Sequence, residues 1–144
     1  MLHITRIAMQ HPLYQQEREL RNKILLRPIG VPDYGWEMYD SKSWHFVAVD
    51  DVRVIGCVLL VPQDENLQVG QLIQMAVDHH WQGKGVGKKL VKDLLAFAKT
   101  KEFTEIVIHS RADVISFYEA LGFQTFGDEF EEVGVVHRHL RMSL

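Results

Sequence analysis

The sequence predicts a mixed α/β or α+β domain built around one sheet with helices packed on it. Two observations support this class. Segments with strand-like and helix-like hydrophobic patterns follow one another in the order strand, helix, three strands, helix, strand, helix, two strands. A chain of 144 residues with 47% hydrophobic residues can also bury one continuous core, so we expect residues 1–144 to form a single domain.

The N-terminal part of the chain contains the first strand and the first helix. Residues His3–Met9 alternate loosely between apolar and polar side chains, which predicts a strand. Pro12 then opens a helical pattern, because Leu13 and Leu20 fall near one helical face. The segment Arg27–Gly35 is crowded with proline and glycine, so we expect an irregular loop that shapes a pocket, with a short helical turn after it.

The middle of the chain predicts three consecutive strands. Trp44–Val49 and Arg53–Val61 are rich in β-branched and aromatic residues, and the acidic pair between them suits an antiparallel hairpin. Pro62 ends the second of these strands. Leu67–Val77 is the next predicted strand, with Gly70 expected to form a bulge or bend.

The last part of the chain predicts two helices and three strands. The clearest helix begins at Val86, because apolar residues recur every four positions as far as Ala98. Asp113 is predicted to cap the later helix, which is ended by Gly122. The other elements are a strand at Glu105–His109, a helix at Val114–Leu121 and strands at Thr125–Phe130 and Val135–Met142.

Charge and cysteine content exclude several functional classes. The net charge of −3 offers no general attraction for a phosphodiester backbone, so we expect no nucleic-acid partner. Cys57 is the only cysteine, which excludes an internal disulfide and a cysteine-based zinc cluster and favours a cytoplasmic location. The longest apolar run, Val54–Val61, is far too short to span a bilayer, so no membrane association is expected.

A glycine-rich segment joins the strand that ends at Val77 to the helix that begins at Val86. Its glycines stand at alternate positions, Gly83, Gly85 and Gly87, which lets the backbone turn tightly and approach a ligand closely. The unpaired N–H groups of a helix N-terminus bind phosphate oxygens, and the nearby lysines add positive charge: Lys84, Lys88 and Lys89. The segment therefore predicts a site for a diphosphate.

Two better-known phosphate loops do not fit this segment. A Walker A loop requires a glycine where Gln82 stands and a serine or threonine where Lys89 stands. The dinucleotide pattern G-x-G-x-x-G fails because Lys88 or Leu90 occupies the position of its third glycine. An ATPase and a Rossmann fold are both disfavoured.

Together with a second segment, the glycine loop resembles the GCN5-related N-acetyltransferase (GNAT) superfamily. Gln82-Gly83-Lys84-Gly85-Val86-Gly87 matches the Q/R-x-x-G-x-G/A signature of that superfamily, and residues 115–123, ISFYEALGF, resemble its F-Y-x-x-L-G-F segment. The resemblance covers residues 44–123 well and the two ends in element order only. It implies a mixed, mostly antiparallel central sheet flanked by helices, and an enzyme that transfers acetyl from acetyl-CoA directly to a primary amine.

The resemblance also implies which residues hold acetyl-CoA. The pantetheine arm would lie along Met75, Ala76 and Val77, with the backbone N–H of Val77 facing the oxyanion of the tetrahedral intermediate. The rest of the cofactor would be held by Gln82, Gly83, Lys84, Gly85, Val86, Gly87, Lys88, Phe117 and Tyr118.

The catalytic residues are predicted from the same resemblance and from residue chemistry. Tyr118 matches the family tyrosine that protonates the departing thiolate. Many relatives carry a glutamate on the strand before the glycine loop, where this chain has glutamines, so the general base must lie elsewhere. The candidates are His109, Glu131, Glu132 and His137, and we select Glu131 and His137. Residues 130–137 also resemble an F-x-E-x-G-I-P-H stretch of some members, and their acidic side chains suit a cationic amine.

Several further expectations concern partners and alternatives. Histidine pairs at 79–80 and at 137 and 139 lack further ligands at matching spacing, so no metal is expected. The acceptor is a small-molecule or peptide amine that the sequence does not identify, and relatives suggest a homodimer. The alternative function is a non-catalytic acyl-CoA sensor or interaction module on the same fold, which the missing strand glutamate favours.

Overall fold

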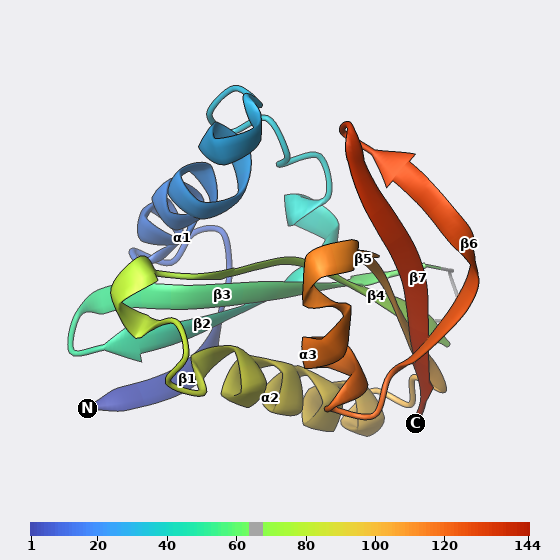
Figure 1. Ribbon diagram of the computed structural model, residues 1–144. Coiled ribbons are helices and arrows are strands. Elements are labelled where there is room, and N and C mark those ends of the chain that lie inside the picture. Colours follow the sequence, from blue (N-terminus) through green and yellow to red (C-terminus); the bar gives the residue numbers. More distant parts are fainter. Residues whose placement is uncertain (64–67) are drawn as a thin grey trace.

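The computed structural model describes residues 1–63 and 68–144, and its architecture confirms the predicted class (Figure 1). Within these residues, seven strands form one sheet: β1 (Leu2–Ile7), β2 (Trp44–Asp50), β3 (Arg53–Pro62), β4 (Val69–Val77), β5 (Glu105–Arg111), β6 (Gln124–Glu132) and β7 (Val135–Ser143). The α-helices in the same ranges are α1 (Tyr14–Arg21), α2 (Val86–Thr100) and α3 (Ile115–Glu119), with shorter helical turns at 22–29, 40–42, 79–81 and 112–114. None of these described helices has both the length and the apolar character needed to pass through a bilayer. The strand predicted from Leu67 is seen from Val69, since Leu67 lies outside the described residues.

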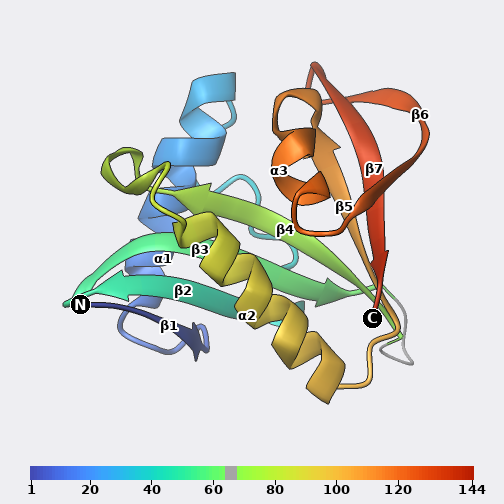
Figure 2. The same ribbon diagram turned by 60° about the horizontal axis from the view of Figure 1, so that its bottom comes forward.

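The sheet is antiparallel except at one place. Its strand order is β1-β2-β3-β4-β5-β7-β6, and only β4 and β5 run parallel. These two strands pair only between Val69–Leu72 and Glu105–Ile108. Both continue beyond this contact, to Val77 and Arg111, and Figure 2 shows them diverging there. Among the residues that the structure describes, no strand therefore pairs with the facing edges of β4 and β5 in this part of the sheet.

A bulge bends β4 just after its pairing with β5 ends. Residues Ile73–Ala76 of β4 lie opposite the shorter stretch Cys57–Leu59 of β3, so β4 carries one extra residue. Gln74, inside this stretch, has a φ of 58°, a left-handed conformation that is rare for residues other than glycine. The prediction of a bulge at Gly70 was wrong. A Cβ there would meet the Leu60 Cδ1 atom at 2.7 Å, so Gly70 serves close packing and not a bend.

The helices α1 and α2 cover opposite faces of the sheet (Figure 1). Alternate residues of β2 point to the two faces, since Phe46 joins the core beneath α2 and Val47 joins the core beneath α1. Tyr118 of α3 belongs to the same core as α2. The buried stripe of α2 follows the predicted helical period: Val86, Leu90, Val91, Leu94 and Ala98.

The helix α3 begins differently from the prediction. Val114 precedes its first residue and no side chain caps it, so the expected cap at Asp113 was wrong. The Asp113 carboxylate instead accepts a hydrogen bond from Arg111 at 3.0 Å. A 3-10 turn at 112–114 leads directly into the helix, which leaves no place for a separate capping residue. Gly122 follows the helix with a φ of 105°, as its position predicted.

Candidate active site

A cavity of about 360 Å³ lies where β4 and β5 diverge, and its volume falls in the range of small-molecule sites. Four parts of the chain line it: the segment from α1 to Tyr39, the bulged part of β4, the end of β5 with α3, and the β6–β7 turn. Its lining is mostly apolar. The histidines and charged residues of the lining are His109, Arg111, Glu132 and His137, all on the side of β5 and the β6–β7 hairpin.

The glycine loop leads from β4 into α2 with an open surface. Gly83 and Gly85 have φ values of 77° and 83°, and a Cβ on either would meet nothing within 4 Å. Gly85 immediately precedes α2, so the N–H groups of the first helical turn have no partners within the helix and are free to bind an anion. Gln82 holds the loop against β4, because its side-chain amide donates a hydrogen bond to the Val77 carbonyl at 2.9 Å.

Side chains around the loop anchor it and supply positive charge. Val86 is buried in the core at the first position of α2. The Lys84 ammonium lies 5.6 Å from the centre of the Trp81 ring, a cation–π distance. Lys88 is exposed in the first turn of α2. Lys84 in the loop and Lys88 in the first turn therefore bring two positive charges to the region of this helix N-terminus.

The start of α2 lies against the two other segments that were predicted to bind the cofactor, one on β4 and one on α3. A Cβ on Gly87 would lie 3.2 Å from the Phe117 ring and 3.9 Å from the Met75 sulfur. Met75 and Val77 pack on the core beneath α2, whereas Ala76 is buried beneath α1. Residues that are far apart in the sequence thus come together from β4, α2 and α3, and of the three β4 residues Met75 is the one that lines the cavity.

Tyr118 brings a phenol into the wall of the cavity. Its side chain is buried, lines the cavity and packs edge-on against Phe117 and Phe123. Burial raises the pKa of the phenol, so its hydroxyl keeps a proton well above neutral pH. A protonated hydroxyl at this position can donate to a group that is bound in the cavity.

A carboxylate and two histidines face the cavity from β5 and the β6–β7 hairpin. The Glu132 carboxylate lies 3.6 Å from His137 Nε2 and 3.4 Å from His109 Nδ1. The His137 Nδ1 atom donates its hydrogen to the Val135 carbonyl at 2.8 Å, because a carbonyl can only accept. This bond orients the ring and leaves Nε2 directed towards Glu132. The cluster can accept a proton from an amine in the cavity.

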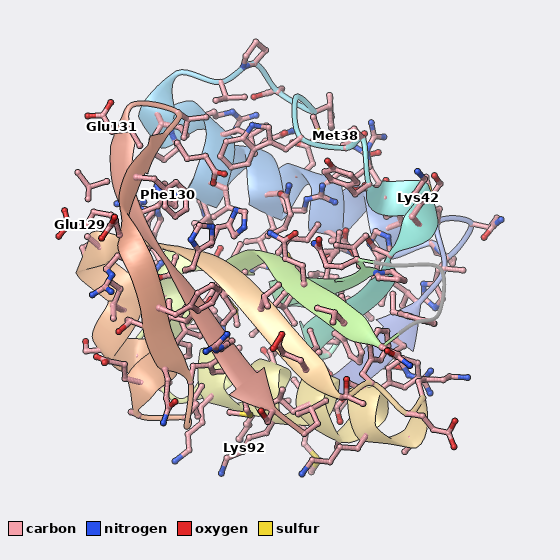
Figure 3. The ribbon with its side chains drawn as sticks, turned by 90° about the vertical axis from the view of Figure 1, so that its right-hand side faces the viewer. Met38, Lys42, Lys92, Glu129, Phe130 and Glu131 are labelled. Atoms are coloured by element: carbon pink, nitrogen blue, oxygen red, sulfur yellow. The ribbon has the colours of Figure 1, made fainter. Side chains whose placement is uncertain are left out.

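The structure separates the two selected base candidates. His137 lines the cavity, whereas Glu131 is exposed and is not part of the lining. In Figure 3, Glu131 projects outward from the edge of the β6–β7 hairpin. Adjacent residues of a strand point to opposite sides, which explains why Glu132 and not Glu131 lies beside the histidines.

A buried ionic network lies behind the wall of the cavity. Arg21 donates hydrogen bonds of 2.9 Å to Glu17 and to both carboxylate oxygens of Asp40. It also donates to the Gln74 side chain at 3.2 Å and to the Trp36 carbonyl at 2.9 Å. Gln74 donates to the same carbonyl at 3.0 Å. The network therefore ties the bulge of β4 to the segment around Trp36, and both line the cavity.

The same network contains a group with metal-like spacing. Ligand atoms of Glu17, Asp40 and His45 lie within 4.8 Å of one another. The Arg21 guanidinium already lies against both carboxylates and offsets one of their two negative charges. The one signal in the sequence was the spacing of Glu17 and Arg21 at i and i+4, which is also usual for exposed pairs on a helix.

Stability is expected to depend on the protonation of His45. Its Nδ1 atom lies 2.9 Å from Glu17 and its Nε2 atom 2.8 Å from the Asp40 carbonyl. Burial acts to lower the pKa of His45, but the hydrogen bond and charge of Glu17 outweigh burial and raise it. Protonation therefore stabilises the fold fully below the ordinary pKa of 6.5, and this contribution is lost as pH rises through the raised pKa.

Urea unfolding between about pH 5 and pH 9 checks this expectation. The free energy of unfolding should exceed that of the His45→Gln variant most at low pH, and the difference should shrink as the pH rises. A difference that grows with pH would contradict the assignment.

Known proteins resemble this chain in sequence. A family model described as an acetyltransferase (GNAT) domain matches residues 32–144. The N-acetylaspartate synthetase of Xenopus tropicalis is 35% identical over 106 residues, which cover 72% of this chain and 36% of that protein. The N-alpha-acetyltransferase 30 of Schizosaccharomyces pombe is 29% identical over 126 residues, which cover 83% of each. The chain thus spans about a third of the synthetase and most of the second relative.

Solved structures share the fold over nearly the whole chain. Escherichia coli ElaA has a TM-score of 0.86 at 16% identity and covers 98% of this chain, which covers 99% of ElaA. A GNAT family acetyltransferase from Elizabethkingia anophelis, with acetyl-CoA bound, has a TM-score of 0.78 at 21% identity, with coverage of 99% and 98%. At these identities the likeness concerns the fold.

Proposed function

The chain belongs to the acetyltransferase (GNAT) domain family, and from this we propose that it transfers acetyl from acetyl-CoA directly to the primary amine of an acceptor. One observation carries the proposal: an open glycine loop at the N-terminus of α2 lies beside a cavity that holds both a buried phenol and a carboxylate–histidine cluster. The names of the relatives refer to N-acetylation, and one structural neighbour has acetyl-CoA bound, which supports the same co-substrate here.

The cofactor is proposed to lie along the loop and the free edge of β4. The pyrophosphate binds the N–H groups and lysines of the glycine loop, where the open space above Gly83 and Gly85 admits it. The pantetheine arm follows Met75, Ala76 and Val77, because no described strand pairs with this edge of β4 beyond Leu72 and its backbone can pair with the amides of the arm. Phe117 and Tyr118 lie beside the arm. The residues assigned to the loop are Gln82, Gly83, Lys84, Gly85, Val86, Gly87 and Lys88.

Side chains of the cavity are proposed to take protons from the acceptor amine and to give a proton to the leaving thiolate. Glu132, beside His137, takes a proton from the ammonium group of the acceptor, and the neutral nitrogen then attacks the thioester carbonyl carbon. The new C–N bond places negative charge on the carbonyl oxygen, towards which the Val77 N–H donates. When the oxyanion collapses, the C–S bond breaks and Tyr118 gives its proton to the departing thiolate. The nitrogen loses its second proton to the Glu132 cluster, which leaves an amide and free CoA. Solvent then returns one of the two protons on the cluster to Tyr118 and carries the other away.

Glu132 replaces Glu131 in this proposal, because its carboxylate and not that of Glu131 reaches the cavity. Cys57 takes no covalent part. Its thiol is buried, donates a hydrogen bond to the Gln74 carbonyl at 3.4 Å and has a pKa that burial raises. Transfer is therefore direct, without an acyl-enzyme.

Several features stay predictions: the single-domain organisation, the cytoplasmic location, the homodimer, the lack of nucleic-acid and membrane partners and the independence from metal.

A pair of glycine variants tests the cofactor site. Gly85→Ala and Gly30→Ala each place a Cβ on a residue with positive φ and open surroundings, so each should lose about 1–2 kcal/mol of stability. Only in Gly85→Ala does the added methyl group also cover the proposed anion-binding loop. We expect calorimetry to show at least about tenfold weaker acetyl-CoA binding for Gly85→Ala and unchanged binding for Gly30→Ala.

Amine-dependent release of CoA tests the activity itself. The proposal requires that the wild-type protein bind acetyl-CoA and release the thiol in the presence of an amine. Binding without release for any amine would favour the non-catalytic acyl-CoA sensor. A protein that does not bind acetyl-CoA, or equal affinities for the two glycine variants, would overturn the assignment of the loop.

A further inference from the structure

Exposed apolar side chains gather at the mouth of the cavity. Met38 is 64% exposed, Tyr39 and Val133 are each 50% exposed and Val114 is 40% exposed, and all four line the cavity. Single exposed apolar residues are ordinary on a protein surface, but several around one cavity are typical of a binding site. They come from separate parts of the chain, since Figure 3 shows Met38 apart from the β6–β7 hairpin whose turn contains Val133.

The charged groups of the cavity are few. Among the described residues that line it, Glu132 is the only carboxylate and Arg111 the only arginine or lysine. The Arg111 guanidinium donates a hydrogen bond to Asp113 at 3.0 Å, so its charge is already paired. Within the described residues, the groups that can form an ion pair with Glu132 are His109 and His137, and each does so only when its imidazole is protonated. The cavity therefore suits a ligand with one cationic group and no carboxylate.

The apolar wall on the far side of the cavity is held in place from behind. The Trp36 carbonyl accepts hydrogen bonds from Arg21 at 2.9 Å and from Gln74 at 3.0 Å. Leu25 and Ile29 continue the same wall. A wall that is already ordered gives up little conformational entropy when a ligand binds.

We infer that the acceptor is a small primary amine whose ammonium group is carried on an apolar body, either aromatic or branched aliphatic. The inference rests on the proposed function. The ammonium group binds at Glu132, and the body lies against Met38, Tyr39 and Val133. A polyamine would place a second ammonium group against this apolar mouth, and an acidic amino acid would bring a carboxylate beside Glu132.

A comparison of acceptor amines tests the inference. CoA release is measured with phenethylamine and isopentylamine as apolar amines, and with spermidine and L-aspartate as amines of the two excluded kinds. The apolar amines should be used with a kcat/KM at least about tenfold higher, because a fitting apolar group contributes a factor of this order or more to discrimination.

Surface variants connect that preference to the mouth of the cavity. Met38→Ser and Val133→Ser should each raise the KM for phenethylamine about three- to tenfold and leave kcat and the KM for acetyl-CoA nearly unchanged. Val136→Ser is the matched control. Val136 is 40% exposed on the same hairpin but is not part of the lining, so its replacement should leave all three constants unchanged.

The outcomes separate the inference from the proposed function. Faster turnover of spermidine or L-aspartate would overturn the inference and leave an acetyltransferase. Equal behaviour of Met38→Ser, Val133→Ser and Val136→Ser would also overturn it. If no amine is turned over, the proposed function fails, and the binding of phenethylamine to the CoA complex is then measured by calorimetry. If phenethylamine binds and Met38→Ser weakens this binding, the apolar-amine site is supported. If phenethylamine does not bind, the inference is overturned.

Discussion

The Tyr118→Phe variant is expected to lose about 100-fold or more in kcat while it keeps its fold and its affinity for acetyl-CoA. The change removes one hydroxyl from a buried side chain and keeps the ring that packs against Phe117 and Phe123. Burial raises the pKa of this phenol, so in the wild type the proton is present over the whole working range of pH. Without it, the thiolate must leave without a proton from the protein. Steady-state CoA release and calorimetry measure the two parts of this prediction.

Tyr34→Phe is the matched control for this experiment. The Tyr34 hydroxyl donates a hydrogen bond to Glu19 on the surface, and its ring is not part of the cavity lining. Its removal should leave kcat unchanged. A Tyr118→Phe enzyme with wild-type kcat would show that water or another group protonates the thiolate, and Tyr118 would then be a packing residue.

The Arg21→Met variant is expected to lose about 3–5 kcal/mol of unfolding free energy. Arg21 is 2% exposed, and its removal leaves the carboxylates of Glu17 and Asp40 buried without their cation. Urea unfolding near neutral pH measures the loss. Gln74, whose backbone is strained, would also lose one of its two side-chain hydrogen bonds, so we expect a higher KM for acetyl-CoA wherever the variant still folds.

Arg18→Met is the control that separates the loss of the buried network from the mere loss of an arginine on α1. Arg18 is on the same helix and pairs with Glu37 at 2.8 Å, but both side chains are partly exposed to solvent. Water can replace such a partner, so the expected loss is about 1 kcal/mol or less. Similar losses for the two variants would contradict a special role for the buried network.

The order of strands and helices could be predicted because it depends on neighbouring residues. The helical period from Val86 to Ala98 and the hairpin around Asp50 both appeared close to their predicted bounds. The left-handed φ values of Gly83 and Gly85 also follow from local chemistry, since glycine adopts them without a steric penalty.

The predictions from sequence failed locally where tertiary packing decided the backbone conformation. The bulge formed at Gln74 and not at Gly70, because the Arg21 network stabilises the strained glutamine, while Leu60 takes the space beside the glycine. No pattern near Gln74 indicates this, since its partners come from α1 and from the segment around Trp36.

The sequence by itself determined the class of fold, the glycine loop before α2 and the position of Tyr118, because each depends on contiguous residues with a fixed period or a fixed backbone preference. Only the tertiary structure decided which carboxylate reaches the cavity, since Glu131 and Glu132 are equivalent until the register of β6 turns one of them inward. It also brought Arg21, Gln74 and Trp36 together behind the cavity wall. Such contacts join distant segments, and their partners are chosen by shape and charge after the sheet has formed.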